Sequence, residues 1–161
     1  TGSPRVRKTR GMILELLLAR CPTSTELQAL AAGYGVTKPR FEPDKDKGKC
    51  ILCGLCTRTC TEVVGVSAIG CTERGIHKKV ATPYLEPSES CIGCGACAFV
   101  CPTGHIVMWE KDGVRNIWGR TFEMTACLKC GRHFAPHYQL EFIAKTTGVA
   151  IERLQTCQDC R

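Results

Sequence analysis

The sequence contains few aromatic residues and no apolar run long enough to cross a membrane. Phe, Trp and Tyr together make up 6% of its 161 residues. The longest apolar segment, residues 13–19, is interrupted by Glu15 and falls short of the roughly 18 apolar residues that a bilayer requires. Basic residues precede it, as in a signal peptide, but Arg20 follows it and no small-residue cleavage site comes next. We therefore expect an amphipathic helix in a cytoplasmic protein.

Two kinds of functional pattern are also missing from the sequence. It has no glycine-rich loop suited to nucleotide phosphates and no Ser, His and Asp pattern suited to nucleophilic catalysis. The basic residues near the C-terminus lack the aromatic interleaving that is typical of nucleic-acid binding. The side chains alone thus give no support to a catalytic site.

Cysteine is the residue type in excess, since the chain contains 14. Such a density indicates either a disulfide scaffold or several metal sites. In a reducing cytoplasm, closely spaced cysteines bind metal in preference to forming disulfides. The spacing of the cysteines therefore decides which chemistry they serve.

Eight of the cysteines form two runs with the same spacing. Residues 50–60 and residues 91–101 both read C-x2-C-x2-C-x3-C, and Pro102 follows the second run. This is the pattern of two-cluster bacterial ferredoxins, in which the fourth cysteine of each run binds the other cluster. We expect that fourth cysteine to begin a helix that crosses between the clusters. The predicted ligands are Cys50, Cys53, Cys56 and Cys101 for the first [4Fe–4S] cluster, and Cys91, Cys94, Cys97 and Cys60 for the second.

The residues between the ligands suit a buried iron–sulfur cube. Glycine lets the backbone approach closely, and we expect amides near Gly54, Gly93 and Gly95 to donate hydrogen bonds to sulfur. Apolar neighbours are expected to exclude water and to influence the reduction potential. These neighbours are Ile51, Leu52, Leu55, Ile92, Phe99 and Val100.

Four more cysteines form two C-x2-C pairs, Cys127 with Cys130 and Cys157 with Cys160. Two tight turns of this kind place four thiolates around one ion, which is the pattern of a structural zinc site. The 26 residues between the pairs leave room for a helix over about 137–147. A third iron–sulfur centre, a disulfide or free thiols are the alternatives to zinc.

These sites would offset most of the formal net charge of +7. Four thiolates leave about −2 on an oxidised [4Fe–4S] core and about −2 on zinc. Two clusters and one zinc ion would thus bring the net charge to about +1. The basic excess therefore gives little reason to expect a nucleic-acid partner.

Local signals predict helices at the N-terminus and a hairpin after the cysteine runs. Pro22 ends the first helix, and Thr23 with Glu26 forms a capping-box pattern for a second. Asp112-Gly113 suits the tight turn of a β-hairpin.

We therefore expect an α+β fold: a bacterial-type 2[4Fe–4S] ferredoxin core that two helices precede and a β-hairpin with a zinc-ribbon-like module follows. A polar linker over residues 41–49 would join the helices to the core. The predicted domains are an N-terminal helical segment (1–40), a 2[4Fe–4S] ferredoxin-like domain (41–110) and a zinc-ribbon-like C-x2-C module (111–161).

The cysteine runs and their surroundings resemble a known family. Val-Gly-Val-Ser-Ala-Ile-Gly stands between the runs at 64–70, and the second run continues as Cys-Pro-Thr-Gly at 101–104. With these motifs, residues 1–110 resemble the dicluster region of the large iron–sulfur subunit of respiratory complex I. The same module occurs in iron hydrogenases and NAD-linked formate dehydrogenases. The resemblance implies an electron-transfer role between a flavoprotein or NAD(P)H-oxidising subunit and a catalytic oxidoreductase subunit.

The chain departs from that family after the first helix, where the family holds a further cluster through one His and three Cys. Here Cys21 replaces the His and Thr25 replaces the last cysteine, so we expect this cluster to be absent. We interpret Cys21 and Cys71 as small buried hydrophobic residues, with a labile ligand role as the alternative for Cys71. His105 stands where the family usually has Ala, and it is a candidate for tuning the potential by hydrogen bonding.

Two functions are consistent with these patterns. The first is a non-catalytic electron-transfer subunit of an oxidoreductase complex, although the sequence leaves the question of enzymatic activity open. The second is a structural or nucleic-acid-associated iron–sulfur and zinc protein whose clusters maintain its shape. The charge balance and the resemblance favour the first.

Overall fold

A computed structural model describes residues 2–43 and 48–161, so part of the predicted linker over 41–49 lies outside the described residues. The chain divides into two compact units. The first comprises Thr1–Gly54 and Cys101–His105, and the second comprises Leu55–Val100 and Ile106–Arg161. Among the described residues, no helix combines the length and the hydropathy needed to cross a bilayer.

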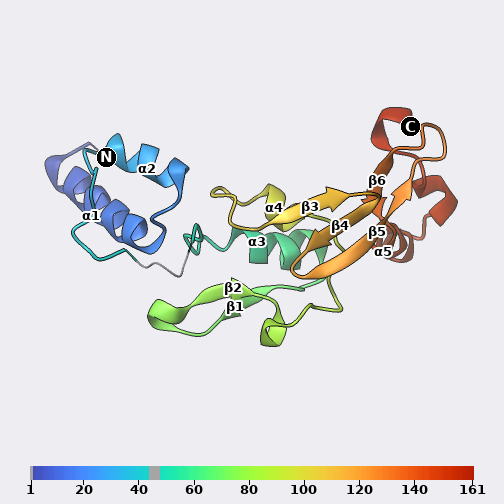
Figure 1. Cartoon of the computed structure of the whole chain (residues 1–161), viewed down its shortest axis with the longest axis horizontal. Helices are drawn as coiled ribbons and strands as arrows, with labels where there is room; N and C mark the ends of the chain where they lie inside the picture. The colour runs from blue at the N-terminus through green and yellow to red at the C-terminus, as the bar shows by residue number, and fades with distance from the viewer. Residues whose placement is uncertain (1, 44–47) are drawn as a thin grey trace. The chain divides into compact units, whose positions relative to one another are not determined.

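Two helices form most of the first unit. Helix α1 (Pro4–Arg20) and helix α2 (Thr25–Ala32) pack side by side (Figure 1). Apolar residues at helical spacing fill the space between them, because they lie on one face of each helix. This core consists of Leu14, Leu18, Cys21, Leu27 and Ala31.

The second helix begins one residue later than its capping pattern predicts. Ser24, not Thr23, is the N-cap residue, and its Oγ accepts a hydrogen bond from the Leu27 N–H at 3.3 Å. Ser24 is fully buried. The hydroxyl also donates to the Glu26 carboxylate at 3.0 Å, so it uses both donor and acceptor capacity inside the fold.

The second unit contains short helices around the cysteine runs and two antiparallel sheets. The small sheet pairs β1 (Gly70–Thr72) with β2 (Lys79–Ala81). Helix α3 (Leu55–Arg58) continues into a π-helical turn, η1 (Thr59–Val64), and helix α4 (Ala96–Phe99) follows later. Short 3-10 turns occur at η2 (Gly75–His77), η3 (Pro83–Leu85), η4 (Ile151–Leu154) and η5 (Gln158–Cys160).

The larger sheet has four strands in the order β3-β4-β5-β6, all antiparallel (Figure 1). Asp112 and Gly113, with φ of 51° and 76°, form the tight turn between β3 and β4, as their sequence predicts. Helix α5 packs against β5 and β6 and coincides with the helix predicted over 137–147. The elements are β3 (Met108–Lys111), β4 (Val114–Ile117), β5 (Arg120–Ala126), β6 (His133–Pro136) and α5 (His137–Thr147).

The mixture of helices and sheets agrees with the predicted α+β class. Sequence reasoning located the first hairpin of the larger sheet but missed β1, β2, β5 and β6. The buried side chains of the sheet include Ile117, Phe122 and Met124, and of these Ile117 and Phe122 face the segment that carries the second cysteine run.

Candidate metal centres

Four predicted ligands line one cavity in the second unit. Cys60, Cys91, Cys94 and Cys97 all contribute to the wall of this cavity. The rest of the wall is apolar except for the indole of Trp118, and it consists of Val64, Val66, Ala68, Ile69, Ile92, Gly95, Ala96, Ile117 and Trp118. Four thiols in an apolar wall match the donor set and the water-excluding surroundings of a [4Fe–4S] cluster. These residues therefore fit the predicted group.

The helices beside the cysteines begin earlier than predicted. Gly54 and Gly95 have φ of 76° and 77°, and α3 and α4 start immediately after them. The third cysteine of each run therefore lies in a first helical turn, and the prediction that the fourth cysteine begins a helix is wrong. The left-handed backbone at each glycine turns the chain into the helix before that position is reached. Cys60 lies inside the π-helical turn, and Cys101 follows α4.

Hydrogen-bond donors from separate segments reach the cavity sulfurs. The Ala68 N–H donates to Cys60 Sγ at 3.2 Å, and the Trp118 indole N–H donates to Cys97 Sγ at 3.4 Å. Burial raises the pKa of Cys91 and Cys97. The Gly93 amide at Cys91 and the indole at Cys97 act in the opposite direction and favour the thiolates. The predicted amide donor near Gly93 is thus present.

Arg120, at the start of β5, holds the segment that leads into Cys91. Its Nη1 donates to the carbonyl oxygens of Ser88, Glu89 and Cys91 at 3.0, 2.6 and 2.9 Å. The guanidinium carbon lies 5.0 Å from the Phe122 ring centroid and 4.9 Å from that of Tyr138. Two aromatic faces therefore position a cation beside a site that is expected to carry negative charge.

The same sheet touches the cysteine run at three more points. Arg115 is buried, and its Nη1 donates to the Gly93 carbonyl at 2.7 Å. A Cβ atom at Gly93 would lie 2.7 Å from the Phe122 ring, and one at Gly95 would lie 2.7 Å from the Met108 sulfur. The glycines therefore permit close packing of strand side chains on the loop. Sequence reasoning missed Arg115, Trp118 and Arg120, because strand pairing alone brings them to the second cysteine run, about 20 to 30 residues earlier.

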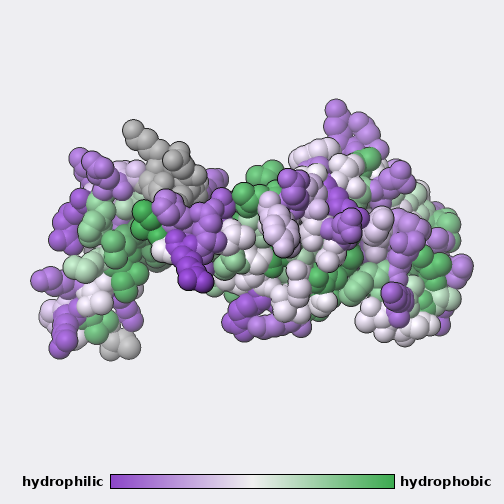
Figure 2. Space-filling view, turned by 90° about the horizontal axis from the view of Figure 1, so that it is seen from below, coloured by the Kyte–Doolittle hydropathy of each residue, from purple (hydrophilic) through white to green (hydrophobic). Residues whose placement is uncertain are grey.

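The predicted apolar coat is only partly correct. Ile92 is buried in the cavity wall, but Phe99 is 92% exposed and Leu55 is 44% exposed. Phe99 lies two residues after Cys97 on α4, and residues at that spacing point to opposite sides of a helix. Figure 2 shows apolar and hydrophilic residues intermixed on the face turned to the viewer.

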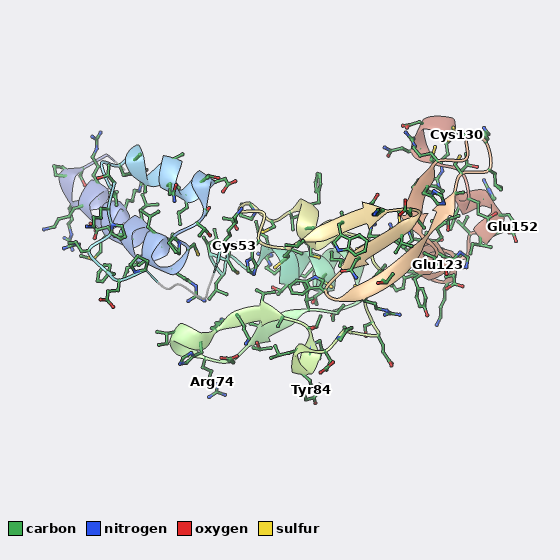
Figure 3. The ribbon with its side chains drawn as sticks, viewed as in Figure 1. Cys53, Arg74, Tyr84, Glu123, Cys130 and Glu152 are labelled. Carbon is green, nitrogen blue, oxygen red and sulfur yellow. The ribbon has the colours of Figure 1, made fainter. Side chains whose placement is uncertain are left out.

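The first unit brings together three ligands predicted for the other cluster. Burial raises the pKa of Cys50, and nearby Cys101 and Cys53 would oppose its ionisation further. Cys101 Sγ accepts a hydrogen bond from the His105 backbone N–H at 3.2 Å. Cys53 is exposed (Figure 3). Cys56 belongs to the second unit, so its assignment to this cluster rests on the sequence spacing.

The two leftover cysteines differ from each other. Cys21 is fully buried, as predicted, and its Sγ donates to the Cys50 carbonyl at 2.9 Å. Cys71 is exposed on β1, so its interpretation as a buried packing residue is wrong. The alternating pattern of a short strand places it on the solvent side.

His105 contacts Cys101 through its backbone amide, and this contact needs no particular side chain at that position. Burial lowers the pKa of the His105 imidazole. The hydrogen bond that would tune a sulfur at this position is therefore made by the main chain.

The last four cysteines meet in one compact group. Cys127, Cys130, Cys157 and Cys160 have all their Sγ atoms within 4.8 Å of one another. The Sγ atoms of Cys130 and Cys157 are 3.8 Å apart, which is the edge of a tetrahedron with metal–sulfur bonds of about 2.3 Å. A cube holds its thiolates on four different irons and hence farther apart. Cys130 marks this site in Figure 3.

Backbone and arginine donors favour ionised sulfur in this group. Hydrogen bonds from the amides of Cys157 and Cys130 lower the pKa of Cys127 to about 6. Burial opposes ionisation of Cys157, but Arg132, with Nη2 at 3.6 Å, contributes to lowering its pKa. Hydrogen bonding to the neighbouring thiols raises the pKa of Cys160 to about 12. A cation bound among the four sulfurs would supply the positive charge that full ionisation requires.

Comparison with known proteins identifies the family. The model of the 4Fe-4S dicluster domain matches residues 49–105 and 90–135. The chain belongs to this family, and the match extends beyond residue 110, where the resemblance inferred from the sequence ends.

Several relatives come from oxidoreductases. An NADH-quinone oxidoreductase subunit of Rhizobium meliloti is 31% identical over 156 residues, which cover 81% of this chain and 18% of that protein. The NADP-reducing hydrogenase subunit HndD of Solidesulfovibrio fructosivorans is 31% identical over 140 residues, with 68% and 24% covered. The crystal structure of an NAD+-reducing [NiFe]-hydrogenase in the H2-reduced state aligns with a TM-score of 0.51 at 29% identity. That alignment covers 63% of this chain and 54% of the other.

These relatives confirm the resemblance to complex I and hydrogenase subunits. The chain spans about a fifth of the length of the curated relatives it matches.

Two glycine substitutions test how closely the sheet packs on the second run. Gly93 and Gly148 both have φ of 71°, but a Cβ at Gly148 meets nothing within 4 Å. Gly148→Ala should therefore cost only the left-handed backbone penalty, about 1–2 kcal/mol. Gly93→Ala adds the clash with Phe122 and should lower the free energy of unfolding by a further ~1–3 kcal/mol. Anaerobic chemical denaturation measures the difference, and equal destabilisation by the two variants would contradict this packing.

Proposed function

We propose that this chain is the electron-relay part of an oxidoreductase complex and carries two [4Fe–4S] clusters. The observation that carries the proposal is the cavity whose otherwise apolar wall contains Cys60, Cys91, Cys94 and Cys97. A bound [4Fe–4S] cluster accepts and releases single electrons. The family membership and the relatives among NADH-quinone oxidoreductase and hydrogenase subunits support the same role.

The protein contributes ligands, hydrogen bonds and exclusion of water. In the proposed second centre, apolar residues such as Ile69, Ile92 and Ile117 keep water from the sulfurs. Cys60 of the first cysteine run would be the fourth ligand of the second cluster. Such an exchange of fourth ligands is expected of a dicluster protein. We assign Cys50, Cys53, Cys56 and Cys101 to the first cluster by the same rule.

A one-electron carrier needs one partner that donates electrons and another that accepts them. We propose that a flavoprotein or NAD(P)H-oxidising subunit supplies electrons and that a catalytic oxidoreductase subunit receives them. The chain itself would act without substrate chemistry, in a reducing cytoplasm where thiolates persist as ligands. We propose that residues 1–40 form a helical packing segment, that residues 41–110 carry the cluster ligands, and that residues 111–161 both bind zinc and supply donors to the second cysteine run.

We also propose that Cys127, Cys130, Cys157 and Cys160 bind one zinc ion in a zinc-ribbon-like module. Two observations support zinc over a cubane. The sulfur atoms lie within 4.8 Å of one another, and the Cys130–Cys157 distance of 3.8 Å is the edge expected around one tetrahedral ion. A backbone hydrogen bond also joins the two loops that carry the cysteine pairs: the Leu128 N–H donates to the Gln155 carbonyl at 3.0 Å. The ion would thus close a structural site.

Replacing single ligands tests the relay. Cys53→Ser and Cys94→Ser each remove one proposed ligand, so electron flow from NAD(P)H through the native complex should fall at least tenfold. Cys71→Ser is the matched control, because Cys71 is an exposed cysteine outside both sets. The rate is measured in complexes isolated through a tag on this chain. Undiminished turnover in both ligand variants would refute the relay.

A further substitution tests the zinc site independently of the clusters. Cys130→Ser removes one of four thiolates, so bound zinc should fall from about one per chain to near zero after dialysis against a chelator. The iron content should stay at the wild-type value. Metal analysis of Cys130→Ser beside Cys71→Ser gives both numbers. Loss of iron in place of zinc from Cys130→Ser would show that the C-terminal thiols hold an iron centre.

A further inference from the structure

Trp118 joins the C-terminal sheet to a proposed cluster ligand. It stands in the turn between β4 and β5, and its indole N–H donates to Cys97 Sγ at 3.4 Å. The residue also lines the cavity that contains Cys60, Cys91, Cys94 and Cys97, and Figure 1 shows the strands that flank its turn. The inference drawn from this contact rests on the proposed function, since it concerns the second cluster.

The backbone at Trp118 is strained. Trp118 and Gly119 form a two-residue hairpin turn with φ of 55° and 72°. The first position of such a turn favours Asn, Asp or Gly, and a bulky residue in the left-handed region is strained. Strained residues cluster at functional sites. At this turn the strained residue lines the cavity wall.

The geometry points to a specific electrostatic effect. The indole is a donor without an acceptor, so it can only supply positive charge density to the sulfur. One-electron reduction of the second centre adds one negative charge, which the thiolate ligands share. A donor to Cys97 therefore stabilises the reduced form more than the oxidised form, and the apolar wall strengthens the interaction.

We infer that Trp118 is a positioning residue that raises the reduction potential of the second cluster through its hydrogen bond to Cys97. The ring would also shield the cluster, but a substituted ring without the N–H would retain most of that shielding. Removing the indole N–H while keeping an aromatic ring therefore separates the effect of the hydrogen bond from the effect of shielding.

The test compares the two tryptophans of the chain in the full-length, anaerobically purified protein. Trp118→Phe keeps an aromatic ring and removes the donor, while Trp109→Phe makes a similar change at a half-exposed residue on β3. EPR-monitored redox titration gives the potential of each cluster, and the first cluster serves as an internal reference.

Trp118→Phe should increase the ratio of oxidised to reduced second cluster at the wild-type midpoint by about three- to tenfold. A tenfold change corresponds to about 59 mV for one electron. Trp109→Phe and the first cluster should not shift. An unchanged second-cluster potential in Trp118→Phe, with both clusters present, would overturn the inference and leave the relay intact.

A second measurement does not depend on how Trp118→Phe folds. In Trp109→Phe protein labelled with ¹⁵N only at the indole nitrogen, Trp118 is the single labelled position. Pulsed EPR of the reduced second cluster should detect one coupled ¹⁵N nucleus. Absence of that coupling beside a normal cluster signal would overturn the inference. Absence of the second-cluster signal from the wild-type protein would instead refute the proposed function from which the inference starts.

Discussion

Arg120 holds in place a segment that has little regular structure of its own. Backbone carbonyl groups that lie outside helices and sheets need other partners, and one guanidinium nitrogen lies within 3.0 Å of three of them, at Ser88, Glu89 and Cys91. The rings of Phe122 on β5 and Tyr138 on α5 fix that guanidinium. Helix α5 lies between the two C-terminal cysteine pairs in the sequence. A stable C-terminal part is therefore a condition for an ordered second cysteine run.

The C-terminal sheet therefore belongs structurally with the second cysteine run. The sequence suggests a separate module that begins near residue 111, but side chains of β3, β4 and β5 pack on the loop that carries Cys91, Cys94 and Cys97. They supply cations and an indole donor to a site whose thiolates are expected to be negative. The family match to residues 90–135 includes these strands. We interpret the sheet as part of the second centre and the four-thiol group as the support for its far end.

The sequence predicts those features that depend on spacing or on one local turn. The cysteine intervals, the turn at Asp112-Gly113 and the helix α5 all follow from short-range patterns. The sequence does not predict contacts that depend on strand register. Trp118 and Arg120 lie beside Cys97 and Cys91 because antiparallel pairing sets the register of β3, β4 and β5, and no pattern along the chain marks their partners. The sequence does not predict the exposure of Phe99 for a related reason, since the helical phase of one short turn decides which way its side chain points.

We propose that two [4Fe–4S] clusters and one separate zinc ion occupy the cysteine groups. Anaerobic metal analysis of the purified wild-type chain, with EPR spectra after dithionite reduction, tests it most directly. We expect about eight irons and one zinc ion per chain and spectra of two interacting reduced clusters. Zinc with little or no iron, after anaerobic handling throughout, would contradict it.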